Sequence, residues 1–116
     1  MKVIIAGSRE GIRKEGVLQV LSNSPFKVSE VVCGEARGVD TYGKEWAESL
    51  DIKVTPFPAD WDKYGNRAGY IRNEEMAKYA DVLIAIWNGE SKGTKHMIDL
   101  AIKHKLHILL INTSQI

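Results

Sequence analysis

Cysteine is almost absent from this chain, and long apolar runs are absent altogether. Cys33 is the only cysteine among 116 residues, which excludes an intramolecular disulfide and a four-cysteine zinc site. No apolar run approaches the roughly 20 residues that a membrane-spanning helix requires. Met1-Lys2 is followed directly by a strand-like run, Val3–Ala6, which provides neither the apolar core nor the cleavage site of a secretion signal. We therefore expect a cytoplasmic protein with no membrane partner.

An excess of charge of either sign is also missing. The chain has 16 basic and 15 acidic residues, for a net charge of +1. Proteins that bind long nucleic acid usually carry a clear basic excess, so the balance argues against such a partner. The histidines do not form a metal motif: His96 and His104 stand two helical turns apart, and His107 begins an apolar run. We expect neither a metal nor a cofactor.

What the chain does contain is enough apolar residue, 44%, for one buried core. Runs rich in valine and isoleucine alternate with stretches of helical periodicity, and no linker or repeat interrupts residues 1–116, so we expect a single domain. In the second helix, Trp46, Ala47 and Leu50 fall at the spacing of one apolar face. The expected strands are Lys2–Ala6, Glu30–Cys33, Lys53–Phe57, Val82–Ile86 and His107–Ile111, and the expected helices are Ile12–Leu21, Asp40–Leu50, Ala68–Tyr79 and Lys95–His104.

This alternation predicts an α/β fold of the Rossmann-like, doubly wound kind. Strands that are apolar on both faces are typical of a parallel sheet covered by helices. Right-handed crossovers then give a five-stranded parallel sheet in the order 3-2-1-4-5, with helices on both faces.

Three of the expected strands end in loops that combine glycine with hydrogen-bond donors. Because the carboxyl ends of parallel strands meet at one edge of the sheet, we expect these loops to lie together. Glycine lets a phosphate approach the backbone, and a helix N-terminus attracts anions. The pattern predicts a nucleotide or a sugar phosphate as the ligand. The expected contacts in the loops are Gly7, Ser8, Arg9, Gly34, Arg37, Gly38, Asp40, Gly89, Ser91, Gly93 and Thr94.

Each loop also has a purely structural interpretation. Gly7-Ser8-Arg9 would serve equally as an ordinary turn, and Asp40 as a helix cap or a partner that orients Arg37. Ser91 or Thr94 would serve as the N-cap of the last helix.

Two further groups add candidates at the same edge. Arg72 and Asn73 stand on the helix 68–79, where Arg72 would contact a phosphate or, alternatively, pair with Glu74 or Glu75. The long connection 56–68 contains the aromatics Trp61 and Tyr64. We interpret Trp61 as a ligand contact that stacks on a base or forms a lid; the alternative is that both aromatics only cover the helix layer.

Several of these motifs resemble a known superfamily. Val32–Thr41 is similar to the glycine-rich signature of the DNA-processing protein DprA, also called Smf. Arg72 through Gly93-Thr94 is similar to the core of LOG enzymes, the nucleoside-5′-monophosphate phosphoribohydrolases that activate cytokinins. Gly7-Ser8-Arg9 and Pro58–Trp61 resemble the YspA/YpsA-related branch of the same superfamily, SLOG. The resemblance implies a Rossmann-like domain that binds nucleotides, nucleotide-derived signals or, as in DprA, single-stranded DNA, and it implies self-association into a homo-oligomer.

One departure from the LOG pattern bears on catalysis. LOG enzymes carry Pro-Gly-Gly-x-Gly-Thr-x-x-Glu, and this chain has Met97 where the catalytic glutamate belongs. Methionine cannot stabilise an oxocarbenium-like state or position water. Asp99 lies about 200° around the helix from Met97, so it does not replace that glutamate. Glu35 and Asp40 are the weak substitutes, with Arg72 as a helper.

The sequence therefore favours a protein that binds a nucleotide-derived small molecule, for sensing or sequestration, and that is not an enzyme. Two alternatives stay open. One is a LOG-like nucleotide N-glycosidase, or phosphoribohydrolase, with a displaced carboxylate. The other is a single-stranded nucleic-acid-binding domain like that of DprA.

Overall fold

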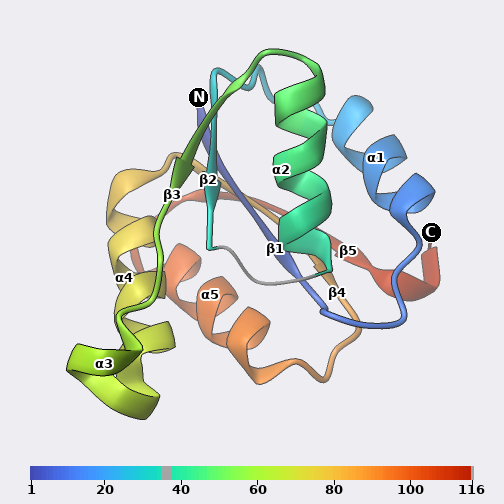
Figure 1. Ribbon diagram of the computed structural model, residues 1–116. Helices are drawn as coiled ribbons and strands as arrows, with labels where there is room; N and C mark the ends of the chain where they lie inside the picture. Colours follow the sequence, from blue (N-terminus) through green and yellow to red (C-terminus); the bar gives the residue numbers. More distant parts are fainter. Residues whose placement is uncertain (35–37, 116) are drawn as a thin grey trace.

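The computed structural model describes residues 1–34 and 38–115 and consists of a parallel β-sheet between two layers of helices (Figure 1). The strands are β1 (Lys2–Gly7), β2 (Glu30–Cys33), β3 (Lys53–Pro56), β4 (Val82–Trp87) and β5 (His107–Asn112). They form one sheet in the order β3-β2-β1-β4-β5, and all neighbouring pairs are parallel. This confirms the predicted fold class and strand order.

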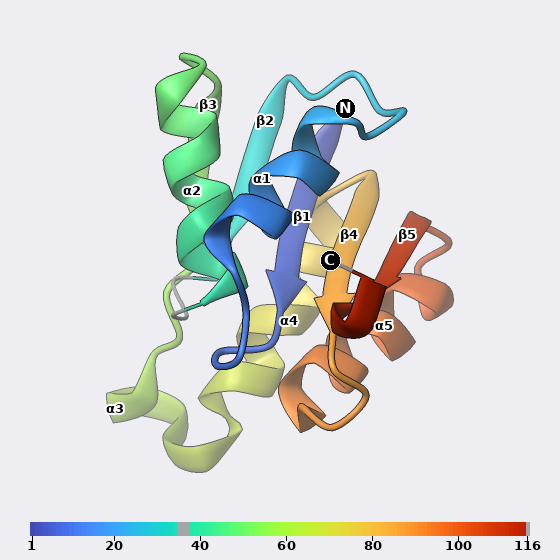
Figure 2. The same ribbon diagram turned by 90° about the vertical axis from the view of Figure 1, so that its right-hand side faces the viewer.

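The helices divide between the two faces of the sheet (Figure 2). Helices α1 (Lys14–Ser22) and α2 (Val39–Ser49) cover one face, whereas α4 (Ala68–Tyr79) and α5 (Lys92–Lys103) cover the other. Successive residues of a strand point to opposite faces. Val3 and Ile5 of β1 accordingly pack with α1 and α2, while Ile4 and Ala6 pack with α4 and α5. The result is two hydrophobic cores that share the central strands.

The structure corrects several details of the sequence-based expectation. Helix α1 begins at Lys14, two residues later than expected. The connection 56–68 is not a plain loop, because it contains the single-turn helix α3 (Trp61–Tyr64) and the 3₁₀ turn η1 (Gly65–Arg67). Helix α5 begins at Lys92, earlier than expected. Leu50 does not join the apolar face of α2: it follows the last helical residue and is exposed, because the chain turns there. A final 3₁₀ turn, η2 (Thr113–Gln115), follows β5.

Across the described residues, no helix combines the length and the apolarity needed to traverse a bilayer.

Candidate functional site

The candidate site is a cavity at the carboxyl edge of the sheet, where β1 and β4 end side by side. Figure 2 shows the arrowheads of these strands at the same end of the molecule as the start of α5 and the segment around α3. The cavity has a volume of about 280 Å³. Loops and helices from distant parts of the sequence contribute predicted residues to its lining, namely Gly7, Arg9, Asp40, Arg72, Asn73, Ser91, Gly93 and Thr94.

Two of the predicted glycines are needed for close packing at this edge. A Cβ atom added to Gly7 would lie 2.1 Å from the carbonyl oxygen of Ile86. The end of β1 can therefore lie this close to β4 only because residue 7 is glycine. Gly38 has a φ of +78°, and a Cβ there would lie 2.6 Å from the carbonyl oxygen of Ser8. Gly38 therefore lets the N-terminus of α2 pack onto the loop after β1.

Ser8 ties the loops together from a buried position. Its backbone N–H donates to Ile86 (3.1 Å), and its carbonyl accepts from the N–H of Val39 (3.3 Å). Its hydroxyl oxygen accepts a hydrogen bond from the backbone N–H of Asn88 at 3.0 Å. Ser8 is buried and does not line the cavity. It therefore holds the surrounding loops in place and is not itself exposed to the cavity.

Arg72 is held at the cavity wall by neighbours on both sides. Its Nε donates to Oδ1 of Asn73 at 3.0 Å, and its Nη1 donates to the carbonyl of Gly34. A Cβ on Gly34 would lie 3.1 Å from Nη1 of Arg72 and 3.1 Å from Oδ2 of Asp40. The absence of a side chain at Gly34 thus makes room for a guanidinium and a carboxylate at the same point. Glu74, one of the two predicted alternative partners of Arg72, instead contacts His104 (3.0 Å) and Lys78 (3.9 Å).

Asn73 connects α4 to the start of α5. Its Nδ2 lies 3.2 Å from Nδ1 of His96 and 3.5 Å from the carbonyl oxygen of Gly93. Burial lowers the pKa of His96, and the carboxylates of Asp99 and Glu74 oppose this effect. The neutral ring accepts the hydrogen bond from Asn73 at Nδ1, so Asn73 bridges His96 and Arg72.

The first turn of α5 forms another wall of the cavity. Ser91 is the N-cap, and its hydroxyl oxygen accepts from the N–H of Thr94 at 3.4 Å, while the two hydroxyl oxygens lie 3.1 Å apart. The carboxamide of Asn88 shapes the preceding turn by accepting from the N–H groups of Glu90 and Ser91. Gly89 has a φ of +84° in this turn and does not line the cavity. Nothing lies within 4 Å of a Cβ built on Gly93, so the backbone is open there.

Met97, the residue at the expected position of the LOG glutamate, lines the cavity. Met97 and Met76 both line it and are almost fully buried. Asp99 points away and forms an exposed ion pair with Lys95 at 3.0 Å. Of the carboxylate candidates, Asp40 lines the cavity, whereas Glu35 lies outside the described residues, as does the predicted ligand contact Arg37.

A second compartment of about 190 Å³ adjoins the cavity and contains the predicted Trp61. Sequence reasoning missed two of its other members, Tyr70 and Asn66. Tyr70 stands three residues before Asn73, a spacing that places side chains next to each other on a helix, so this signal was present. Tyr64, the other predicted aromatic, does not line the compartment and lies under the ammonium of Lys63 at 5.1 Å.

No group of at least three histidine, cysteine or acidic side chains is arranged to hold a metal ion within residues 1–34 and 38–115. Cys33 is buried at the end of β2, as expected for a small packing residue.

Known proteins resemble this chain in sequence and in fold. Residues 1–64 match the family model described as the YspA, cpYpsA-related SLOG family. The gene 61 protein of Mycobacterium phage D29 is 36% identical over 118 residues, covering 93% of this chain and 94% of the phage protein. Among solved structures, the DNA processing protein A (DprA) of Streptococcus pneumoniae superposes with a TM-score of 0.66 at 16% identity, covering 94% of this chain. The alignment takes in 49% of DprA, so this chain spans about half its length, and the likeness is one of fold.

Proposed function

This chain belongs to the YspA, cpYpsA-related SLOG family, and from that premise we propose that it binds a nucleotide or nucleotide-derived small molecule at the carboxyl edge of its sheet. The role would be sensing or sequestration. The observation that carries the proposal is the gathering of Arg9, Arg72 and the first turn of α5 around one cavity.

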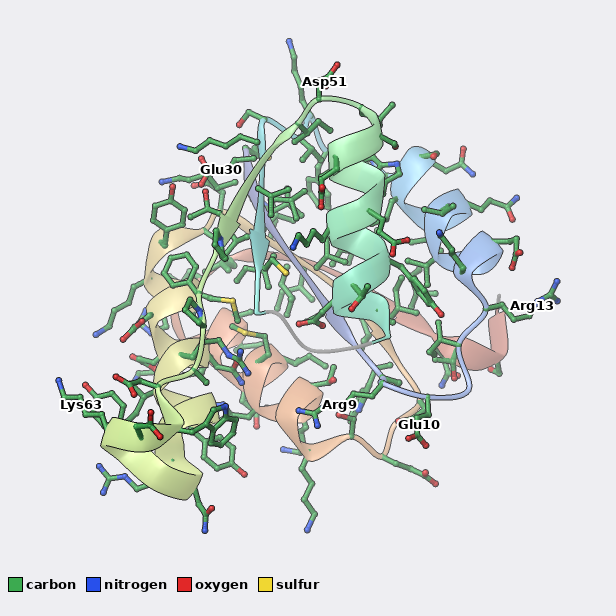
Figure 3. All side chains as sticks on the ribbon, viewed as in Figure 1. Arg9, Glu10, Arg13, Glu30, Asp51 and Lys63 are labelled. Atoms are coloured by element: carbon green, nitrogen blue, oxygen red, sulfur yellow. The ribbon has the colours of Figure 1, made fainter. Side chains whose placement is uncertain are left out.

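The charges of the cavity wall suit an anionic group. Figure 3 shows the Arg9 side chain beside the start of α5, and Arg72 faces the same space from α4. Guanidinium groups form strong, often bidentate hydrogen bonds with phosphate. The N-terminus of α5 adds a partial positive charge, and Gly93 leaves its backbone accessible. A phosphate is therefore best accommodated between the two arginines and the first turn of α5.

Asp40 supports a sugar as the second part of the ligand. An ionised carboxylate only accepts hydrogen bonds, so it would repel a phosphate and attract hydroxyl groups. Asp40 lines the cavity from the first turn of α2, and its carboxylate and the guanidinium of Arg72 both lie close to Gly34. A sugar phosphate would then place a ribose hydroxyl at the carboxylate of Asp40 and its phosphate near the first turn of α5.

A hydrolytic function is the second candidate, and among residues 1–34 and 38–115 its displaced carboxylate would be Asp40. A carboxylate near C1′ of a bound nucleotide could stabilise the oxocarbenium-like state of N-glycosidic cleavage. Met97 removes the carboxylate that LOG enzymes use, which makes this the weaker candidate. For single-stranded DNA binding, the likeness to DprA supports a common fold, and the net charge of +1 argues against strong binding to a long polyanion.

We also infer a homo-oligomer, from the self-association that the family resemblance implies. The edge strand β5 exposes Leu110, which supports this inference. Sedimentation velocity would test it, and a monomer at all concentrations would contradict it.

Calorimetric titration with AMP, CMP, GMP, UMP and ADP-ribose tests the main proposal. We expect at least one of these compounds to bind more tightly than inorganic phosphate does. If none of them binds and no small molecule co-purifies with the protein in native mass spectrometry, the proposal is wrong.

A further inference from the structure

Two large aromatic side chains, Trp61 and Tyr70, stand exposed beside the cavity. Trp61 is 57% exposed and Tyr70 49% exposed, although such side chains are usually more buried. Both line the second compartment, which we call the vestibule and define by Trp61, Tyr70, Asn66 and Gly69 together with the residues that it shares with the cavity. Their exposed faces are available to a planar ring.

Trp61 is positioned next to the anion-binding part of the site. It opens α3, whose N-cap Asp60 accepts a hydrogen bond from the N–H of Lys63 at 3.1 Å. A Cβ added to Gly69 would lie 3.6 Å from Cη2 of Trp61 and 3.8 Å from Nη2 of Arg72. The indole edge and the guanidinium therefore flank the same point on α4.

Tyr70 is held by the network that also holds Arg72. Its ring packs edge-on against His96, with the ring centroids 4.6 Å apart. His96 in turn contacts Asn73, which accepts from Arg72. Because these contacts already orient Tyr70, stacking a ring on it costs little side-chain entropy.

The vestibule and the cavity are continuous at one wall. Arg9, Arg72, Asn73 and Gly93 line both of them. A ligand anchored by its anionic group at this shared wall can extend outward to the aromatic rings. The two volumes, about 280 and 190 Å³, together lie in the lower half of the range of roughly 300–1,000 Å³ for small-molecule pockets. This size fits a mononucleotide better than a dinucleotide.

We propose that the ligand is a nucleoside monophosphate whose base stacks in the vestibule on Trp61 and Tyr70 while its phosphate lies at the wall shared with the cavity. This inference rests on the proposed function and specifies which part of the ligand each compartment takes. Asn66 places a carboxamide at the rim, where it can donate to and accept from the edge of the base.

Paired titrations separate the base from the phosphate. The four 5′-mononucleotides AMP, CMP, GMP and UMP are compared with ribose 5-phosphate, which has the anchor but no base. Aromatic stacking typically changes affinity by roughly 5- to 150-fold per base. We expect Trp61→Ala and Tyr70→Ala each to lower the affinity for the tightest-binding mononucleotide by a factor in this range. The affinity for ribose 5-phosphate should stay within about twofold of that of the unmodified protein. Tyr64→Ala, which removes an aromatic of the same segment outside the vestibule, should change neither.

The outcomes distinguish this inference from the proposed function. If ribose 5-phosphate binds as tightly as the best mononucleotide, or if the two alanine variants weaken both ligands equally, the vestibule does not hold the base, although the anion site stands. If neither ribose 5-phosphate nor any mononucleotide binds the unmodified protein, this inference fails. The proposed function fails as well if ADP-ribose does not bind and no small molecule co-purifies. Trp61→Phe, which keeps an aromatic face, should retain most of the affinity; a loss as large as that of Trp61→Ala would contradict stacking.

Discussion

Arg72 is oriented at the cavity wall before any ligand arrives. Its hydrogen bonds to Asn73 and Gly34 fix the guanidinium, and the partner carbonyl lies 38 residues away in the sequence. A preorganised donor loses little entropy when it binds an anion. In the proposed site, we therefore expect Arg72 to make the largest single contribution to phosphate binding.

Replacing Arg72 by alanine should weaken ligand binding more than it weakens the fold. A charge-assisted hydrogen bond is worth about 1.5–3 kcal/mol, which corresponds to roughly 10- to 150-fold in affinity. Calorimetry with the tightest mononucleotide and thermal melts of the same variant give both quantities. Arg67→Ala, an exposed arginine outside the site, is the matched control. Unchanged affinity together with a large fall in melting temperature would show that Arg72 is only structural.

The expected lack of catalysis depends on Met97, which occupies the position of the LOG glutamate. We expect the unmodified protein to release little or no free base from AMP, CMP, GMP or UMP, as measured by chromatography. Met97→Glu should restore weak activity at best and should lower the melting temperature, because it buries a carboxylate at a position that is 1% exposed. Met97→Leu controls for the change in volume. Multiple turnovers by the unmodified protein, abolished in Asp40→Asn, would establish the hydrolytic alternative.

The residues of the site could be predicted from the sequence only where a motif marks them. Gly7, Arg9 and Gly93 follow strand ends, so their meeting at one edge follows from the parallel sheet. Tyr70 carries only the helical spacing from Asn73, which is compatible with a tyrosine packed in the core and does not by itself indicate a site. The packing role of Gly38 was also invisible, because it depends on the carbonyl of Ser8, 30 positions earlier.

At the scale of elements, Glu30 joins two strands and a helix at the edge of the sheet opposite the site. Figure 3 places Glu30 and Arg9 at opposite ends of the molecule. Oε2 of Glu30 accepts from Oγ1 of Thr55 on β3 at 2.6 Å and from the hydroxyl of Tyr79 on α4. The bonds from Thr55 and Tyr79 lower the pKa of Glu30, and the same contact raises the pKa of Tyr79.

These shifts predict a loss of stability at both ends of the pH scale. The unfolded state binds more protons than the folded state as the pH falls below 4.5, the usual pKa of the glutamate, so the contribution of Glu30 fades in acid. The folded state keeps the proton of Tyr79 above pH 10, so stability falls as the pH rises past that value. Thermal melts give the melting temperature as a function of pH. This temperature should fall less steeply in acid for Glu30→Gln, and less steeply in alkali for Tyr79→Phe, than for the unmodified protein. Glu48→Gln, on the exposed face of α2, is the control, and equal slopes in all variants would contradict the assignment.

The elements themselves were largely predictable because the central strands are continuous apolar runs and helices such as α2 and α5 carry an apolar face. Strand β2 has the expected bounds, and the other strands differ by a residue at the carboxyl end. The start of α5 was expected at Lys95 because Lys92 to Lys95 carry no apolar periodicity. Ser91, one of the two N-caps considered from the sequence, is the N-cap in the structure. Helix α3 was not predicted, because a single turn that is capped by Asp60 is too short to show an apolar periodicity in the sequence.

At the scale of the whole molecule, the balanced charge favours the proposed small-molecule site over a nucleic-acid surface. A net charge of +1 provides no broad field to attract a polyanion. Arg9 and Arg72 act locally within one cavity, which suits a single phosphate.

Single-stranded DNA should therefore bind weakly. A protein with many phosphate contacts loses about 10³–10⁵ in affinity between 50 and 200 mM salt, whereas one or two contacts give a shallow slope. Fluorescence anisotropy with labelled oligothymidine at both salt concentrations measures the slope. Tight binding with a steep slope would favour a DNA-binding role instead.

Amide chemical-shift mapping tests whether the cavity at the carboxyl edge of the sheet is a nucleotide site. ¹⁵N-labelled protein is titrated with each of AMP, CMP, GMP and UMP. A nucleotide in this cavity should cause saturable shifts concentrated at Gly7, Gly93, Thr94 and the N–H groups around Arg72. Shifts that are absent for all four nucleotides, or confined to the opposite edge around Glu30 and Thr55, would contradict a nucleotide site there.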